Sequence, residues 1–437
     1  MIFVDIIRQG VKNIHTVSVT PVQSNIYTSV KDVFNAHGGL NFLLKGKTEA
    51  VIKINAVNSH PYTYTDPSVL KAAILNLYEA GVKKVYVVEN CTQGNFTRLV
   101  FNATEIGNVC HQNGAKPVFL DEGLTCTQKL PQIGEKARFN RWLSSRLGNK
   151  RQQRNVFFLN IPKLKTHSMS VVTLGIKNLL GLMDQRDRMH GHNYKLHEIL
   201  ASLHELFPPD FTLIDGLHAV YHGHYPPAKL LPRCTEKLDI LVGGSNTPAV
   251  DTVGAKILGY NLEEVEHLRL AASSIKLEDI KVKGDMSKYN KKYPYTLIPE
   301  FPADVNIYQG YERCCPEGCY SNTLSLLQLL HLDHNGKGGF NILMGKGFPP
   351  EMLSEIRPPA LIAGQCAINE AAPKLYSKFG SSQIWETPAC NDLATTIKSL
   401  ASLMDVNMME LVPLNPIQSF SLLAKAKLKG SKARINL

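Results

Sequence analysis

The sequence of 437 residues lacks several features that mark common protein classes. Its longest apolar runs, such as residues 171–183, are interrupted by Lys177 and Asn178 and fall short of the roughly 20 apolar residues that span a bilayer. The first residues do not combine a basic segment with an apolar core, so we expect neither a signal peptide nor an integral membrane segment. We therefore expect a cytoplasmic protein.

Signatures of nucleic-acid binding are also missing. The chain has no aromatic RNA-binding signature, no helix-turn-helix pattern and no zinc finger, so we expect no nucleic-acid partner. Its nine cysteines are an odd number without a secretory signal, which argues against a disulfide framework.

The sequence does have an uneven basic charge. The formal net charge is +11, and residues 136–165 hold nine lysines and arginines without an acid. Residues 425–434 add four lysines and an arginine, again without an acid. With nucleic acid set aside, an anionic small molecule is the partner that we expect. The tail is typical of a solvated terminal helix, with an amphipathic surface helix as the alternative.

Apolar strands alternate with helical patterns, which predicts an α/β fold with mostly parallel sheets and helices on both faces. In the first part we expect strands at 50–56, 84–88, 117–120, 155–160, 211–214 and 238–242, and helices at 67–79, 98–112, 196–206 and 249–258. In the second part we expect strands at 305–308, 340–344, 360–363 and 383–385, and helices at 323–332, 368–377 and 393–403. The predicted organisation is an α/β domain at 1–276, a connection at 277–302, a second α/β unit at 303–412 and a basic tail at 413–437.

Residues 163–224 hold eight of the fifteen histidines, beside several lysines and arginines. Imidazole titrates near neutral pH and is a common metal ligand, so this density indicates a site for an anion, a metal or a proton transfer. A solvated polar connection rich in histidine is the alternative. After the strand that Pro162 ends, Lys163, Lys165 and His167 alternate in an extended segment and would share one face. That face suits a phosphate or a carboxylate.

Other polar residues follow in the same region. Lys177 and Asn178 lie in a predicted helix whose N-terminus, near Thr173, would add partial positive charge toward an anion. Asp215 comes directly after a strand, at the edge of a parallel sheet where such folds bind ligands. A surface lysine at Lys177 and an ordinary helix-start acid at Asp251 are the alternatives. The candidate catalytic residues are His167, Lys177 and His190, and the candidate anion-binding or substrate-binding residues are Lys163, Lys165, Asn178, Arg188, Asp215 and Asp251.

Several motifs between residues 30 and 275 resemble one family. They are Lys53-Ile-Asn55, Asn160-Ile-Pro-Lys163-Leu-Lys165-Thr-His167, Thr173-Leu-Gly-Ile-Lys177-Asn178-Leu-Leu-Gly181, Arg188 to His190, Asp215-Gly216 and Pro248-Ala-Val-Asp251. In their order and spacing they resemble the family known as domain of unknown function 362. The resemblance implies that a ferredoxin-type module with 4Fe-4S clusters often accompanies this domain. This chain differs, because it contains no Cys-x2-Cys-x2-Cys-x3-Cys-Pro run.

A group of cysteines lies late in the chain. Cys314-Cys315-Pro-Glu-Gly-Cys319, Cys366 and Cys390 each follow one of the strands expected in the second unit. If those strands are neighbours, their loops bring the thiols together. Cys315, Cys319, Cys366 and Cys390 are therefore candidate ligands for an iron–sulfur cluster of the 4Fe-4S type, or for zinc. Free cysteines that pack as small apolar side chains are the alternative.

The leading hypothesis from the sequence is an iron–sulfur-linked redox enzyme, in which the first domain binds an anionic substrate or cofactor. An electron-transfer protein would then be a partner. A second hypothesis is a redox-neutral lyase or epimerase that depends on a metal or cofactor and acts on a hydroxy or phospho acid. The third is a binding module for an anionic ligand without catalysis.

Overall fold

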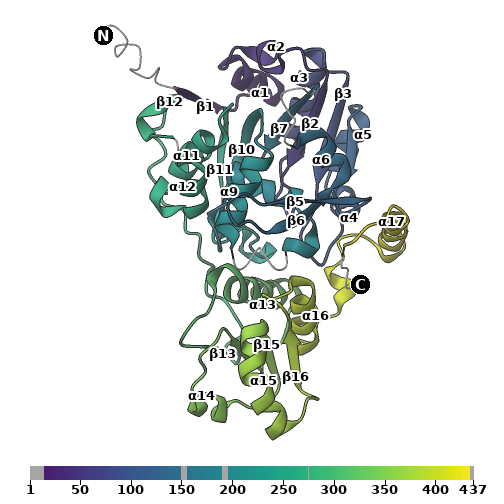
Figure 1. Ribbon diagram of the computed structural model, residues 1–437, viewed down its shortest axis with the longest axis vertical. Helices are drawn as coiled ribbons and strands as arrows, with labels where there is room; N and C mark the ends of the chain where they lie inside the picture. The colour runs from purple at the N-terminus through teal and green to yellow at the C-terminus, as the bar shows by residue number, and fades with distance from the viewer. Residues whose placement is uncertain (1–13, 149–154, 189–194, 274, 434–437) are drawn as a thin grey trace, which may run out of the picture.

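The computed structural model describes residues 14–148, 155–188, 195–273 and 275–433. In these residues a large sheet of ten strands and a small sheet of four strands form two units, one above the other in Figure 1. The predicted α/β class, with mostly parallel strands and helices on both faces, is confirmed.

The large sheet has the strand order β12-β1-β11-β10-β7-β2-β3-β4, with β8 beside β10 and β9 beside β8. Five neighbouring strands, from β10 to β4, run parallel, while β11 is antiparallel to both β10 and β1. The bounds are β1 His15–Pro21, β2 Glu49–Ile54, β3 Lys84–Glu89, β4 Lys116–Phe119, β7 Val156–Ile161, β8 Lys163–His167, β9 Val171–Val172, β10 Phe211–Val220, β11 Thr235–Gly244 and β12 Ile280–Lys283. A separate hairpin is formed by β5 Thr125–Lys129 and β6 Lys136–Asn140.

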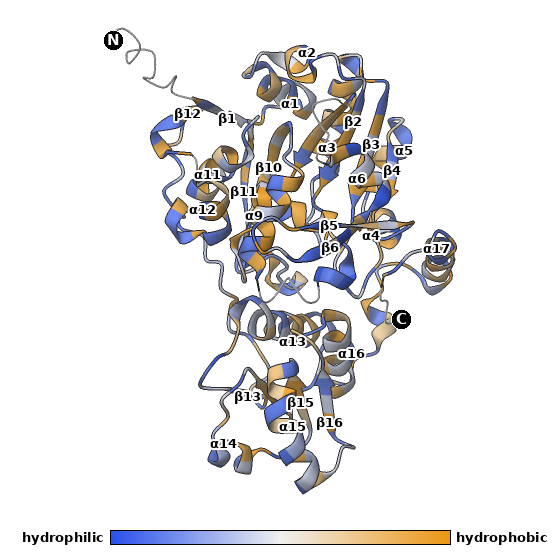
Figure 2. Cartoon of the chain, in the orientation of Figure 1, coloured by the Kyte–Doolittle hydropathy of each residue, from blue (hydrophilic) through white to orange (hydrophobic). Residues whose placement is uncertain are grey.

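Helices cover both faces of the large sheet. One face packs against α1 Ile26–Asn35, α2 Gly39–Leu44, α3 Pro67–Glu79, α4 Thr97–Ala103 and α5 Ile106–Gln112. The other packs against α6 Arg141–Leu147, α7 Leu174–Asn178, α9 Leu196–Leu206, α11 Thr247–Ile257 and α12 Glu266–Ala271. The central strands are apolar along almost their whole length, as Figure 2 shows, because both of their faces are buried.

The small sheet has the order β13-β14-β15-β16 with all strands parallel. Its strands are β13 Asn306–Gln309, β14 Asn341–Met344, β15 Ala360–Ala363 and β16 Ile384–Thr387. One face packs on α13 Ser321–His334 and α16 Leu393–Leu403, and the other on α14 Pro350–Glu355 and α15 Gln365–Phe379. Figure 1 shows α13 and α16 between the small sheet and the large unit, and the last helix, α17 Pro416–Leu428, at the side of the molecule.

The structure differs from the sequence prediction in several elements. The helix expected at 98–112 is two helices, because Thr104 takes an extended conformation between α4 and α5. The strands β10 and β11 are each ten residues long, about twice the expected length. The expected connection at 277–302 contains β12, which joins the edge of the large sheet. Within the described ranges, no helix is both long and apolar enough to cross a membrane.

Candidate functional site

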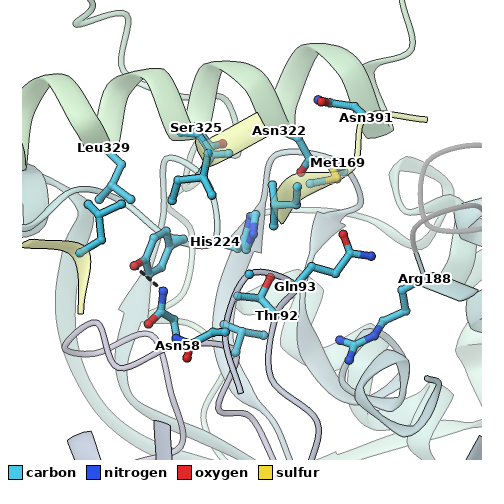
Figure 3. Close-up of a pocket in the computed structure, with 18 of the residues that line it drawn as sticks. Asn58, Thr92, Gln93, Met169, Arg188, His224, Asn322, Ser325, Leu329 and Asn391 are labelled. Atoms are coloured by element: carbon cyan, nitrogen blue, oxygen red, sulfur yellow. Dashed lines mark hydrogen bonds between the residues drawn. The ribbon is translucent and has the colours of Figure 1, made fainter. Parts of the chain in front are cut away.

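A cavity of about 200 Å³ lies where the two units meet. The large unit contributes residues from the loops after β2 and β3 and from the β8 region, and the small unit contributes α13, α16 and Asn391. In Figure 3, α13 crosses above the cavity and directs Asn322, Ser325 and Leu329 toward it. The cavity therefore exists only through the contact of the two units, a common location for ligand sites.

The cavity has a polar part and an apolar part. Its polar part holds two cations, Lys177 and Arg188, beside amide, hydroxyl and imidazole groups. Its apolar part is formed by Leu326, Leu329, Leu393, Ile397, Met408, Leu411, Val412 and Pro413. Figure 3 shows Arg188 and Leu329 on opposite sides of the cavity. This arrangement suits a small molecule with an anionic group and an apolar body.

His167 is held at the polar part by its own strand end. It closes β8, and the backbone N–H of Met169 donates a hydrogen bond of 3.1 Å to its Nδ1. A neutral imidazole whose Nδ1 accepts carries its proton on Nε2. The ring stacks on that of His224, with centroids 3.9 Å apart and planes at 4°. His167 can therefore donate a proton from a fixed position.

Lys177 reaches the cavity from α7 and is almost fully buried, with 7% of its surface exposed. Burial, and then the charges of Arg188 and Lys53, lower the pKa of Lys177 from its ordinary value to about 7. A lysine with this pKa exchanges its proton near neutral pH. An anion bound beside it would favour the charged form.

Arg188 is the second cation of the cavity and is also 7% exposed. Its Nη2 donates to the carbonyl oxygen of Cys91 at 3.0 Å, whereas its buried Nε has no hydrogen-bond partner within the described residues. Burial lowers the pKa of Arg188, yet a guanidinium stays charged in proteins. A buried donor without a partner is costly, so an anion in the cavity would relieve that cost.

Lys163 and Asp215 form a buried ion pair behind the cavity. Lys163 Nζ lies 3.0 Å from each carboxylate oxygen, and the two side chains are 1% and 0% exposed. Asp215 also accepts hydrogen bonds from the backbone N–H groups of Asp66 and Leu217. This pair joins β8 to β10 and holds the strand that ends at His167.

Lys165 lies between that pair and the cavity. Its Nζ donates to the carbonyl oxygen of Thr63 at 2.6 Å. Burial, followed by the charges of Lys177 and Lys163, holds the pKa of Lys165 well below its ordinary range. Of the three alternating basic residues Lys163, Lys165 and His167, only His167 lines the cavity.

Asn178 belongs to a buried polar network. Its Oδ1 accepts from Asn55 at 2.9 Å and from Lys53 at 3.3 Å, and its Nδ2 donates to Asn160 at 2.8 Å. Lys53 in turn pairs with Glu89 at 2.7 Å. Gly181 lies against this pair, and a Cβ there would collide with Glu89 Oε1 and Lys53 Nζ. The network fixes α7, and with it the position of Lys177.

Asp251 supports the same helix from α11. Its two carboxylate oxygens accept from the backbone N–H groups of Gly175 and Ile176, each at 2.7 Å, at the start of α7. Burial raises the pKa of Asp251 to about 7, against the effect of these hydrogen bonds. Asp251 therefore positions Lys177 through α7 and does not itself line the cavity.

The late cysteines meet at the carboxyl edge of the small sheet. Gly364 N–H donates to Thr387 O at 2.9 Å and Gln365 N–H to Ala389 O at 2.7 Å, which ties the Cys366 and Cys390 loops together. Cys319 lies in a short π-helical turn, Pro316–Tyr320, a form that often occurs at functional sites. Burial, and then the thiols of Cys314, Cys315, Cys390 and Cys366, raise the pKa of Cys319 to about 12.

The cysteine region fits a thiolate-bound group in two respects. Gly364 leaves space beside Cys319, because a Cβ at this position would come within 2.5 Å of the sulfur. Ala389 and Asn391, on either side of Cys390, have φ of 56° and 71°, a strained conformation that is often found at functional sites. In the described part of the chain, however, no three His, Cys, Asp or Glu side chains already form a metal site. The thiols would have to turn toward a common centre.

Residues 50–256 match the family model described as domain of unknown function (DUF362). The chain carries a DUF362 domain. No curated protein matches the chain. A protein from Thermotoga maritima of known structure is 12% identical, with a TM-score of 0.32, and the match covers 86% of this chain and 82% of that one. This structural likeness is too weak to transfer any property.

The DUF362 domain contains every site residue predicted in the first half of the chain. Of these, His167, Lys177 and Arg188 line the cavity, while Lys163, Lys165, Asn178, Asp215 and Asp251 form the buried layer behind it. His190 lies outside the described residues. Cys315, Cys319, Cys366 and Cys390 lie outside the DUF362 domain, in the small unit.

The sequence prediction missed most of the cavity wall. Asn58 donates to the hydroxyl of Tyr225 at 2.6 Å, the hydrogen bond that is drawn in Figure 3. Thr92, Gln93, Asn322 and Asn391 complete the polar wall. Only Asn58, Thr92 and Gln93 carried a usable signal, since they follow parallel strands at their carboxyl ends.

Proposed function

We propose that this chain is an iron–sulfur-linked redox enzyme that acts on an anionic small molecule with an apolar part. The observation that supports this most directly is a wall shared by the cavity and the cysteine loops. Asn391 lines the cavity, follows Cys390 directly and donates from Nδ2 to the carbonyl oxygen of Cys319 at 3.5 Å. Asn391 thus connects the cysteine loops to the cavity.

The cavity residues would bind and orient the anion. Lys177 and Arg188 supply positive charge where little water competes, and a carboxylate or phosphate suits both. The apolar wall on α13, α16 and residues 408–413 would hold the rest of the molecule. His167, through Nε2–H, and Lys177 are placed to supply protons to it.

Cys315, Cys319, Cys366 and Cys390 would hold the cluster, and a 4Fe-4S cluster bound there would supply electrons one at a time. Reduction of the substrate then requires two such transfers, from a reduced electron-transfer protein, and two protons. Those protons are the ones that His167 Nε2 and Lys177 Nζ can deliver. A zinc ion held by the same thiols would instead have a structural role.

The test is purification without oxygen, followed by visible absorption and measurement of iron, sulfide and zinc. The proposal expects a broad iron–sulfur absorption and roughly four iron atoms per chain. Cys366→Ser and Cys390→Ser should each lose most of the iron. Cys126→Ser, in the distant strand β5, is the matched control and should keep it. Zinc without iron, or full iron content in both variants, would refute the cluster.

A redox-neutral lyase or epimerase is the second candidate. It is favoured by two groups in one cavity that can exchange protons, His167 through Nε2 and Lys177 with its pKa of about 7. Such an enzyme would need both residues but not the late cysteines. Isotope exchange from deuterated water into a hydroxy acid, retained in Cys366→Ser and lost in His167→Gln, would favour it.

A cytoplasmic location is part of the proposal. None of the described cysteines forms a disulfide, as expected in a reducing compartment.

A further inference from the structure

The last helix, α17, has two apolar faces. Its inner face, with Ser419, Leu422, Leu423 and Ala426, packs on Phe96 and Leu99 at the start of α4. Its outer face carries Ile417, Phe420, Ala424 and Leu428, all exposed. At about 100° per residue, this spacing places the four outer side chains in one stripe along the helix.

The outer stripe is unusually exposed for apolar side chains. Leu428 and Ile417 are 87% and 85% exposed, the highest fractions among the large apolar residues that the structure describes, and Phe420 is 52% exposed. Single exposed apolar residues are common on soluble proteins, but a continuous stripe needs a partner. Figure 1 shows α17 at the side of the molecule.

The charge around the stripe identifies that partner. Lys425 and Lys427 flank the stripe on opposite sides, about 95° and 65° from its centre. Lys429 and Lys432 follow, and residues 416–433 contain no acid. An apolar stripe bordered by lysines is the pattern of a helix that lies in the surface of an anionic membrane.

We propose that α17 docks this protein on an anionic lipid bilayer, with Ile417, Phe420 and Leu428 inserted among the lipids and the lysines at the headgroups. Leu124 extends the surface, because it is 71% exposed and follows Gly123, whose N–H donates to Lys429 O at 2.8 Å. Residues 408–413, which form part of the apolar cavity wall, lead directly into α17. Docking would bring the apolar side of the cavity near the bilayer.

The test is flotation of the full chain with phosphatidylcholine vesicles, with or without about 30% phosphatidylglycerol. We expect binding only to the anionic vesicles, and release between about 0.05 and 0.5 M salt. The triple variant Ile417→Ser/Phe420→Ser/Leu428→Ser should lose binding at least tenfold. In the double variant Lys425→Glu/Lys432→Glu, the affinity for anionic vesicles should fall more than fivefold per lysine, since each substitution removes one positive charge and adds a negative one.

The control is Phe42→Ser, which removes a side chain 66% exposed on α2, away from α17. It should bind like the wild type, and near-ultraviolet circular dichroism should show that all variants fold. Equal binding to neutral vesicles would overturn the proposal. So would a concentration-dependent dimer that the triple serine variant abolishes, because the stripe would then be a contact between two copies. This inference does not depend on the proposed redox function, since vesicle binding requires neither cluster nor substrate.

Discussion

Two regions differ in how far folding alone forms their interactions: the buried layer behind the cavity, and the cysteine loops of the small unit. In the buried layer, Lys163 and Asp215 are 1% and 0% exposed and satisfy each other. In the loops, Cys366 is exposed and Cys315 and Cys390 are half-buried, without formed ligand geometry. The first region is therefore preorganised by the protein, and the second depends on an added group. Changes to the buried layer should alter the stability of the fold, and changes to the cysteine loops should alter the amount of iron that the protein binds.

The largest effect is expected from Asp215→Ala. It leaves Lys163 charged and buried without a partner, which costs about 3–5 kcal/mol in the free energy of unfolding. Urea denaturation measures this cost. Lys337→Ala is the control, because Lys337 and Asp405 form an ion pair in which both side chains are more than 70% exposed, and its loss should change stability by less than about 1 kcal/mol. A similar small effect for both variants would contradict a preorganised layer.

Several elements could be predicted from the sequence because their own residues decide them. The bounds of α3, α9, β15 and α16 agree with the prediction, since their apolar patterns mark them locally. The starts of α3 and α16 are marked further by the N-cap residues Asp66 and Asp392. The edge strand β12 depends on pairing with the distant strand β1, and the local pattern indicated neither this strand nor the break at Thr104.

The site was predictable only in part for the same reason. The gathering of Lys163, Lys165, His167 and Lys177 followed from alternation and motif. Which of them lines the cavity depends on Asp215 on β10 and on the small unit above, and neither is local to β8. Asn391 was missed because an isolated asparagine in a loop carries no sequence signal.

A smaller effect on the buried layer is expected from Asp251→Asn. The amide keeps one acceptor but presents N–H groups to a backbone N–H, so stability should fall by about 1–3 kcal/mol. The raised pKa of Asp251 also makes the stability of the fold depend on pH. Between its ordinary value and about 7, the folded chain holds a proton that the unfolded chain has lost, so stability declines as pH rises. Thermal unfolding from pH 4 to 7 should show a shallower decline in the variant.

Gly364→Ala probes the cysteine loops in the same way. Gly364 has φ of 94°, and the added Cβ would push on Cys319 sulfur. We expect a stability loss of about 1–2 kcal/mol from the backbone conformation, and a loss of at least half the iron. Gly380→Ala is a matched control, because Gly380 has φ of 70° and nothing within 4 Å of the new Cβ. It should share the stability loss and keep its iron. Iron loss in both variants would mean that the close contact at Cys319 has no special role.

The smallest effect distinguishes Lys177 from the other polar groups of the cavity. With octanoate as a probe that carries a carboxylate and a short apolar chain, affinity should be highest below pH 7, where Lys177 is charged. It should fall as pH rises through about 7, by at most tenfold per pH unit, or about 1.4 kcal/mol. Calorimetry in buffers of different ionisation enthalpy should show uptake of a proton on binding above that pH.

Lys177→Arg separates this lysine from His167 and His224, which also line the cavity. A guanidinium stays charged throughout this range, so the variant should bind octanoate with little dependence on pH from 7 to 9. Binding by the histidines would instead keep the same pH dependence in the variant. An unchanged pH profile would therefore assign the titration to the imidazoles. Lys177 would then belong to the preorganised buried layer, as Lys165 does.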